Sequence, residues 1–282
     1  MTVENEIKAY GIKLGADQAG IASVKDVNLI APAGYRPDDI LLGAKSVISY
    51  VARWTPRGAW QSPHYMMHHV NRSFGGSARM KVSLGVSHFI EKTYGYYALA
   101  MEGMMMSQKV PVELAGLGTR SLAGGIILNP ELGPLNIATV LTTMPLEADP
   151  PLRDPVCPHR SCVTMYAKKK TTPCLDKCPE CLSGELEKGS IKWMRFNRHL
   201  CATRAQTLSP SSFQRTLLEI INEPDPDKRK TMLLGGFFSN IMRQIAGGVF
   251  VGQCGECLRV CPVAIKARTL KPKLTGIKPK RT

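Results

Sequence analysis

The nine cysteines most constrain what this 282-residue chain can fold into, because all of them lie after residue 156. They are Cys157, Cys162, Cys174, Cys178, Cys181, Cys201, Cys254, Cys257 and Cys261. This segregation predicts a cysteine-free domain over 1–150 and a cysteine-bearing domain over 151–265, followed by a tail over 266–282. The length accommodates about two domains of ordinary size.

The spacing of the later cysteines is typical of iron–sulfur proteins. Residues 254–262 read CGECLRVCP, which is the bacterial ferredoxin pattern with its first cysteine placed elsewhere in the chain. Residues 174–179 read CLDKCP and supply a second cysteine–proline end. In two-cluster ferredoxins the cysteine before proline binds the other cluster. The two ends therefore predict two [4Fe–4S] clusters that exchange ligands crosswise.

Two such clusters need eight cysteine ligands, and crosswise pairing predicts two sets of four. The first set is Cys157, Cys162, Cys174 and Cys261. The second set is Cys178, Cys201, Cys254 and Cys257. Cys181 is then the spare thiol. It can also replace a member of the first set, because the spacing between the first three cysteines is looser than the usual two residues.

Other interpretations of the cysteines remain open. A structural zinc site with His159 as a further ligand fits a C-x2-C pair, although zinc sites do not call for the trailing x3-C-P. Cys174, Cys178 and Cys181 also match the three-cysteine motif of radical S-adenosylmethionine enzymes. Only 101 residues follow Cys181, too few for the large α/β barrel that follows that motif. The thiols can also be buried apolar residues without a ligand.

The remaining segments show helical and strand patterns. Apolar spacing predicts a helix over 6–16, buried strands over 18–24 and 46–53, and a long helix over 78–103. Between Cys201 and the last motif, residues 208–248 predict a helical insertion that covers the clusters.

Residues 115–149, AGLGTRSLAGGIILNPELGPLNIATVLTTMPLEAD, carry a family resemblance. Together with the cysteine motifs that follow, they resemble the shared core of epoxyqueuosine reductases and corrinoid reductive dehalogenases. The resemblance covers most of residues 10–265. It implies an α+β fold in which a nitroreductase-like domain holds base-off cobalamin beside a two-cluster ferredoxin-like domain. It places the cofactor against the glycine-rich segment, at Gly116, Gly118, Arg120, Asn129 and Gly133.

The same resemblance implies an activity. In this family electrons pass through two clusters to cobalamin, which cleaves a carbon–heteroatom bond reductively. The family's acidic proton donor corresponds to Glu102, where the usual residue is Asp. Glu91 and Glu113 are weaker candidates, and Tyr94, Tyr96 and Tyr97 lie near the dehalogenase tyrosine position without aligning to it. Flavin is an alternative cofactor. The alternative function is a non-catalytic electron-transfer or corrinoid-handling protein.

The charge balance indicates acidic partners. The chain has 37 Lys and Arg against 22 Asp and Glu, a formal net charge of +15. Seven of the basic residues lie within 266–282, and Lys168–Lys170 adds three more. A solubilising tail accounts for the first group. Docking of an acidic electron donor such as flavodoxin or ferredoxin, or of RNA, accounts for both. The substrate is therefore open between a small molecule and an RNA-borne group.

The expected cellular location depends on two features that the sequence does not show, a membrane span and an export signal. No apolar run approaches the roughly 18 residues that a membrane span needs. Residues 1–20 contain neither an apolar signal core nor a twin arginine. We therefore expect a cytoplasmic protein that does not associate with membranes and keeps its thiols reduced.

Overall fold

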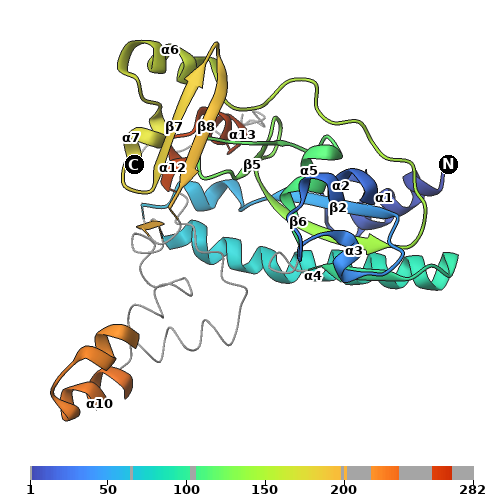
Figure 1. The fold of residues 1–282 in the computed structure, drawn as a ribbon, viewed down its shortest axis with the longest axis horizontal. Helices are drawn as coiled ribbons and strands as arrows, with labels where there is room; N and C mark the ends of the chain where they lie inside the picture. The colour runs from blue at the N-terminus through green and yellow to red at the C-terminus, as the bar shows by residue number, and fades with distance from the viewer. Residues whose placement is uncertain are drawn as a thin grey trace, which may run out of the picture.

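The computed structural model describes residues 2–63, 66–101, 106–197, 200–201, 217–234 and 256–268, and every structural statement concerns these residues. Its six-stranded antiparallel sheet and its helices confirm the α+β class (Figure 1). The sheet order is β1 (Gln18–Ser23), β2 (Ser46–Arg53), β6 (Gly133–Thr142), β5 (Ile127–Asn129) and β4 (Thr119–Arg120), with β3 (Ala98–Met101) also paired to β6. A separate hairpin contains β7 (Leu182–Glu187) and β8 (Ser190–Phe196).

Helices lie on both faces of the sheet and around the hairpin. They are α1 (Val3–Lys13), α2 (Val24–Ile30), α3 (Pro37–Ile40), α4 (Met66–Tyr94), α5 (Lys109–Leu114), α6 (Arg160–Lys169), α7 (Pro173–Lys177), α10 (Pro226–Leu234), α12 (Glu256–Arg259) and α13 (Pro262–Arg268), with a 3-10 turn at Arg57–Trp60. α4 runs along one face of the sheet, and α2 and α5 cover the other (Figure 1).

The period of a β-strand explains why β2 is buried on both faces. Successive side chains of a strand point to opposite sides of the sheet. Ile48 and Tyr50 join the core under α1 and α4, whereas Val47 and Val51 join the core under α2 and α5. A central strand between two helical layers therefore needs the nearly continuous apolar run that the sequence shows.

The predicted helix and strand at the N-terminus are confirmed as α1 and β1, and the second predicted strand as β2. The long helix is confirmed in part, because α4 ends at Tyr94 instead of continuing to residue 103. Gly95 follows in the left-handed region at φ +72°, a conformation that favours glycine and ends helices. Ala98–Met101 then pairs with β6 as a strand, so the helical prediction for these residues is wrong.

A third core contains the cysteines and joins the two halves of the chain. Trp54, Leu122 and Leu128 from the first half pack with the buried cysteines of the second half. Arg53 and Arg57 also reach across. The Nη1 of Arg53 donates to the carbonyl oxygen of Ala267 at 2.6 Å, and the Nε of Arg57 donates to the same oxygen at 3.1 Å. Two guanidinium groups thus close the C-terminal end of α13.

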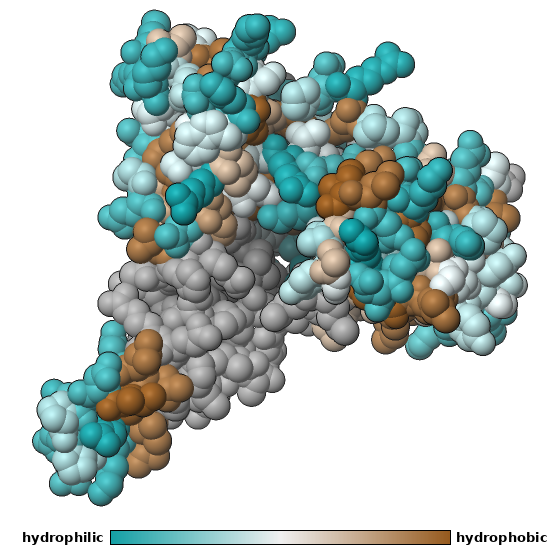
Figure 2. All heavy atoms as spheres, in the orientation of Figure 1, coloured by the Kyte–Doolittle hydropathy of each residue, from teal (hydrophilic) through white to brown (hydrophobic). Residues whose placement is uncertain are grey.

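The region of the predicted insertion is described only over 217–234, which is helical at both ends. α10 has no buried residue, and the exposed apolar side chains Leu218, Ile221, Leu233 and Leu234 lie in this segment, part of it brown in Figure 2. That the insertion covers the clusters stays a prediction. Among the described helices, none is long and apolar enough to cross a membrane.

Candidate metal-cluster site

Eight of the nine cysteines are described, and all eight are buried without a disulfide bond. The ninth, Cys254, lies outside the described residues. A buried cysteine serves either as a small apolar residue or as a ligand. Because most of the described cysteines lie in one core, this core is the candidate site.

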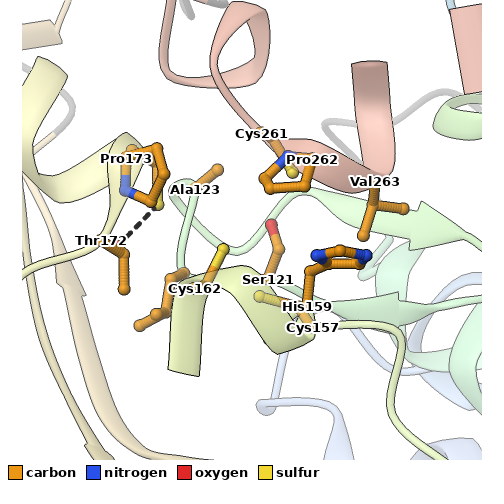
Figure 3. A pocket seen from close by; sticks show the side chains of 12 residues that line it. Ser121, Ala123, Cys157, His159, Cys162, Thr172, Pro173, Cys261, Pro262 and Val263 are labelled. Atoms are coloured by element: carbon orange, nitrogen blue, oxygen red, sulfur yellow. Dashed lines mark hydrogen bonds between the residues drawn. The ribbon is translucent and has the colours of Figure 1, made fainter. Parts of the chain in front are cut away.

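The structure brings the four cysteines of the first predicted set to one pocket (Figure 3). The pocket is lined by Cys157, Cys162, Cys174 and Cys261, together with Ser121, Leu122, Ala123, His159, Thr172, Pro173, Pro262 and Val263. The Ser121–Ala123 stretch belongs to the glycine-rich segment of the first half. The thiols therefore converge next to the segment in which the sequence predicts a cofactor.

Short helices position these thiols. Cys162 lies in the first turn of α6, whose N-terminus is capped by the His159 ring nitrogen accepting from the Ser161 amide at 3.3 Å. Cys174 lies in α7, which begins with Pro173, and Cys261 directly precedes Pro262, the first residue of α13. Proline is favoured at the first helical position, because a backbone N–H at that position would have no acceptor within the helix, so its absence costs no hydrogen bond.

Burial and the proximity of the other cysteines favour the neutral, protonated form of these thiols. The pKa of Cys157 is raised to about 12, chiefly by burial and in smaller part by negative charge on Cys261, Cys174 and Cys162. Burial also raises the pKa of Cys162 and of Cys174. Thiolates at these positions need positive charge among them, which bound metal supplies. Among the described residues, no three His, Cys, Asp or Glu side chains form a ready site for one metal ion.

Thr172 provides a hydrogen bond at the pocket that the sequence did not predict. Its side chain is 0% exposed, and its Oγ1 lies 3.3 Å from the Sγ of Cys174, the dashed line in Figure 3. This hydrogen bond opposes the effect of burial on the pKa of Cys174. The spacing motif does not include Thr172, and only its place two residues before a cysteine hinted at such a contact.

The described cysteines of the second set lie in the same apolar core, with Cys181 among them. The Cys181 amide donates to the carbonyl oxygen of Cys178 at 3.1 Å, and the Asn197 amide donates to the carbonyl of Cys181 at 2.8 Å. The Cys201 amide donates in turn to Asn197 at 3.1 Å. Backbone bonds thus connect Cys178, Cys181 and Cys201, and α12, which carries Cys257, packs against α7.

The predicted cofactor-binding glycines lie against their own chain. A Cβ at Gly116 would meet the carbonyl oxygen of Pro150, and one at Gly118 would lie 2.6 Å from the Ile127 side chain. A Cβ at Gly133 would lie 2.8 Å from the Cβ of Ala267. These close approaches explain why the segment needs glycine. They give the three residues a packing role, and a cofactor contact stays a prediction.

Asn129 and Arg120 have partners within the protein as well. The Asn129 amide nitrogen donates to Gln18 and to the Leu117 carbonyl, both at 2.8 Å. Its oxygen accepts from the amides of Glu131 and Leu132 at 2.8 and 2.9 Å. Arg120 is exposed and forms an ion pair with Glu113 at 2.7 Å. The segment around these residues is therefore held largely by internal bonds.

Of the predicted proton donors, Glu102 lies outside the described residues. Glu113 accepts from the backbone N–H and the side chain of Arg120. Glu91 accepts from the amide of Ala98 at 3.3 Å, at the turn between α4 and β3. Both weaker candidates thus have structural partners, and Glu102 stays a prediction.

Comparisons with known proteins give no match to a family profile or to a curated protein. Solved structures do match. An epoxyqueuosine reductase, selenomethionine-labelled, has a TM-score of 0.55 at 18% identity, covering 93% of this chain and 65% of that chain. An epoxyqueuosine reductase from Bacillus subtilis gives 0.54 at 18% with the same coverage. A catabolic reductive dehalogenase in complex with 3-bromo-4-hydroxybenzoic acid gives 0.51 at 16%, covering 93% of this chain and 37% of that chain.

The chain therefore spans 65% of the length of these epoxyqueuosine reductases. The similarity extends over nearly the whole of this chain, so it includes both the sheet and the cysteine-lined core. It agrees, at the level of the overall fold, with the resemblance that residues 115–149 carry. The chain has the fold that epoxyqueuosine reductases and reductive dehalogenases share.

Proposed function

We propose that this protein is an iron–sulfur oxidoreductase that relays electrons through two [4Fe–4S] clusters to a second cofactor. The observation that carries the proposal is the convergence of Cys157, Cys162, Cys174 and Cys261 on one buried pocket. The donor set fits a cluster, because four thiolates are the usual ligands of a cubane. Cys178, Cys201, Cys254 and Cys257 are proposed to hold the second cluster.

The protein's own residues set the environment of the first cluster. The apolar core around the thiols excludes water, and burial and hydrogen bonds to sulfur both tune the reduction potential. Ser121–Ala123 lines this pocket and lies within the glycine-rich segment. The first cluster is thus proposed as the one that passes electrons to the second cofactor, in a nitroreductase-like domain beside a ferredoxin-like one.

Cobalamin is the proposed second cofactor, on the resemblance of residues 115–149 to the family, with flavin as the alternative. When bound, cobalamin supplies the cobalt centre for reductive cleavage of a carbon–heteroatom bond, and the protein supplies position and protons. We propose Glu102 as the residue that delivers a proton. The relatives reduce epoxyqueuosine or remove halogen, and we extend only the bond-cleavage class to this chain.

The second candidate function is a non-catalytic electron-transfer or corrinoid-handling protein. One observation favours it: Gly116, Gly118, Asn129 and Gly133 are all engaged with their own chain. Described residues of this segment therefore offer few unused groups to a cofactor. Both candidates need the clusters, so they differ only at the second cofactor and at Glu102.

Anaerobic purification followed by cobalamin addition separates these candidates. Enzyme function predicts about eight irons per chain, a base-off cobalamin spectrum, and turnover of an epoxide or halogenated test compound. Glu102→Gln is expected to abolish turnover and to keep iron and cobalamin binding, whereas the exposed control Glu147→Gln keeps all three. Iron without cobalamin uptake would assign the electron-transfer function. Colourless protein with stoichiometric zinc would overturn both.

Thr172 gives a prediction for the first cluster. Thr172→Val removes the hydroxyl next to Cys174 and is expected to make the cluster's midpoint potential more negative, because that hydrogen bond stabilises the extra electron on the reduced cluster. The expected shift is up to about 60 mV, since one hydrogen bond contributes up to about tenfold in a one-electron equilibrium. Potentiometric titration followed by electron paramagnetic resonance measures it.

Thr172→Ser keeps the hydroxyl and is the matched control for that titration. It is expected to retain the wild-type potential, with both variants carrying full iron. Equal potentials in the wild type and the valine variant, at full iron content, would show that the hydroxyl does not act on the cluster.

An acidic one-electron donor protein, such as flavodoxin or ferredoxin, is the proposed partner. Lys168–Lys170 is exposed at the C-terminal end of α6 and precedes Cys174 by only a few residues. Opposite charge steers such an encounter and weakens with salt. RNA stays the alternative partner for this basic surface, and the cytoplasm stays the proposed location.

A further inference from the structure

A cavity of about 100 Å³ lies between α4 and the sheet, away from the cysteine pocket. β2 and β6 form one wall, α4 forms the opposite wall, and the end of α1 closes one side. One water needs only about 10–15 Å³ measured in this way. The cavity is therefore large enough for a small ligand group instead of a single solvent molecule.

Two arginine residues line this cavity. Arg53 comes from the end of β2 and Arg79 comes from α4, and both are partly buried. The amide of Asn136 on β6 lies in the same wall. Among the described residues that line the cavity, none is acidic. The Nδ2 of Asn136 already donates to the carbonyl oxygens of Arg53 and Trp54 at 3.3 and 2.8 Å. The lining therefore contributes two cationic residues, of the kind that binds phosphate and carboxylate in proteins.

The surroundings of Arg53 leave positive charge at the cavity. Its Nη1 donates to the carbonyl oxygens of Leu132 and Ala267, which are neutral acceptors. Burial, and then the charge of Arg57, lower the pKa of Arg53, whereas Asp17 has the smaller opposite effect. Neutral carbonyl acceptors offset the desolvation of this cation only in part, so an anion in the cavity would stabilise it further.

The rest of the lining and a second cavity show how a ligand would lie. Ala16, Val51, Ala78, Val82 and Ala138 make most of the wall apolar. A smaller cavity of about 20 Å³ also contains Arg79 and Ala138 and extends to Met101 and Gln108. Met101 directly precedes the proposed proton donor Glu102. The two cavities therefore share Arg79 and Ala138 in their linings, and the smaller one extends to the residue that precedes Glu102 in the sequence.

We propose that the cavity between α4 and the sheet binds the anionic group of the substrate, a phosphate or a carboxylate attached to an apolar body. Arg79 and Arg53 would pair with the anion, and the apolar wall would contact the body next to it. The assignment to the substrate rests on the proposed function, whereas the anion site itself depends only on these residues.

The test is calorimetric titration of the purified protein with inorganic phosphate and, separately, with acetate. Saturable binding of at least one anion is expected in the wild type. Arg79→Gln is expected to weaken it at least tenfold, because it removes a charge-assisted bond. Arg79→Lys keeps the charge but loses the planar guanidinium, and its anion affinity is expected to lie between those of the wild type and Arg79→Gln. Lys81→Gln, an exposed site on the same helix, makes the same charge change and is expected to bind like the wild type.

Circular dichroism establishes that the variants are folded, and iron content is measured on the same samples. Equal anion affinity in the wild type and in folded Arg79→Gln overturns the site, as does the absence of saturable binding in the wild type. Neither result depends on iron, so failure of the site is distinct from failure of the proposed clusters. Titration of cobalamin-loaded protein distinguishes the source of the anion. Retained phosphate binding supports the substrate's group, and blocked binding overturns that assignment in favour of a phosphate of the cofactor.

Discussion

Replacing Cys174 by alanine is expected to remove about half of the iron, from about eight to about four atoms per chain, because one of the two proposed cubane clusters loses a ligand. Cys174 lines the pocket that also contains Cys157, Cys162 and Cys261. Three thiols in an apolar environment hold a cubane poorly, since the fourth iron then lacks a protein ligand. Metal analysis of anaerobically reconstituted protein measures the loss.

Cys181→Ala is the matched control, because it removes an equally buried thiol that crosswise pairing leaves spare. It is expected to keep the full iron content. If Cys181→Ala loses iron and Cys174→Ala does not, the two residues exchange roles in the ligand sets. If both variants keep full iron, the cysteine pocket is not a cluster site.

Asn129→Ala is expected to lower the free energy of unfolding by about 3 to 5 kcal/mol, because several buried backbone groups lose their partner at about 1–3 kcal/mol each. The side chain is 3% exposed and bonds to Leu117, Glu131 and Leu132 as well as Gln18. Without it, the turn between β5 and β6 has unpaired donors. Thermal unfolding of the cofactor-free protein measures the effect, with an expected fall in Tm of about 10 °C.

Gln18→Ala serves as the control for Asn129. It removes the partner that bonds to Asn129 through its side chain, whereas Leu117, Glu131 and Leu132 bond through backbone groups, and it is expected to cost about 1 kcal/mol. A cofactor ligand without a structural role would behave differently. In that case Asn129→Ala would leave the Tm of the cofactor-free protein unchanged and would lower only the affinity for the cofactor.

The elements set by local pattern were predictable from the sequence. α1 and β2 follow from the spacing of their apolar residues, which depends only on the period of each element. β3 was not predictable, because Ala98–Met101 continues the apolar pattern of α4 and becomes a strand only through its pairing with β6. A distant partner decided the outcome, and a local pattern contains no information about it.

The candidate site shows the same contrast between local features, which the sequence predicted, and contacts between distant residues, which it did not. The crosswise pairing expected from the cysteine–proline ends indicated which four thiols share a pocket, although Cys157, Cys162 and Cys174 are loosely spaced. The contacts of Thr172 with Cys174 and of Ser121–Ala123 with the pocket needed the folded chain. The glycines show the limit most clearly. Their presence indicated a close approach of the backbone, but the partners proved to be Pro150 and Ala267 of the same chain.

The bond between Arg53 and the end of α13 has a consequence for how the two halves communicate. α13 starts immediately after Cys261, and its last turn accepts a hydrogen bond from Arg53, a residue that also lines the cavity between α4 and the sheet. One side chain therefore joins a thiol of the cysteine pocket to the proposed anion site through a single short helix. A shift of that helix on cluster assembly or reduction would reposition the charge that an incoming ligand meets.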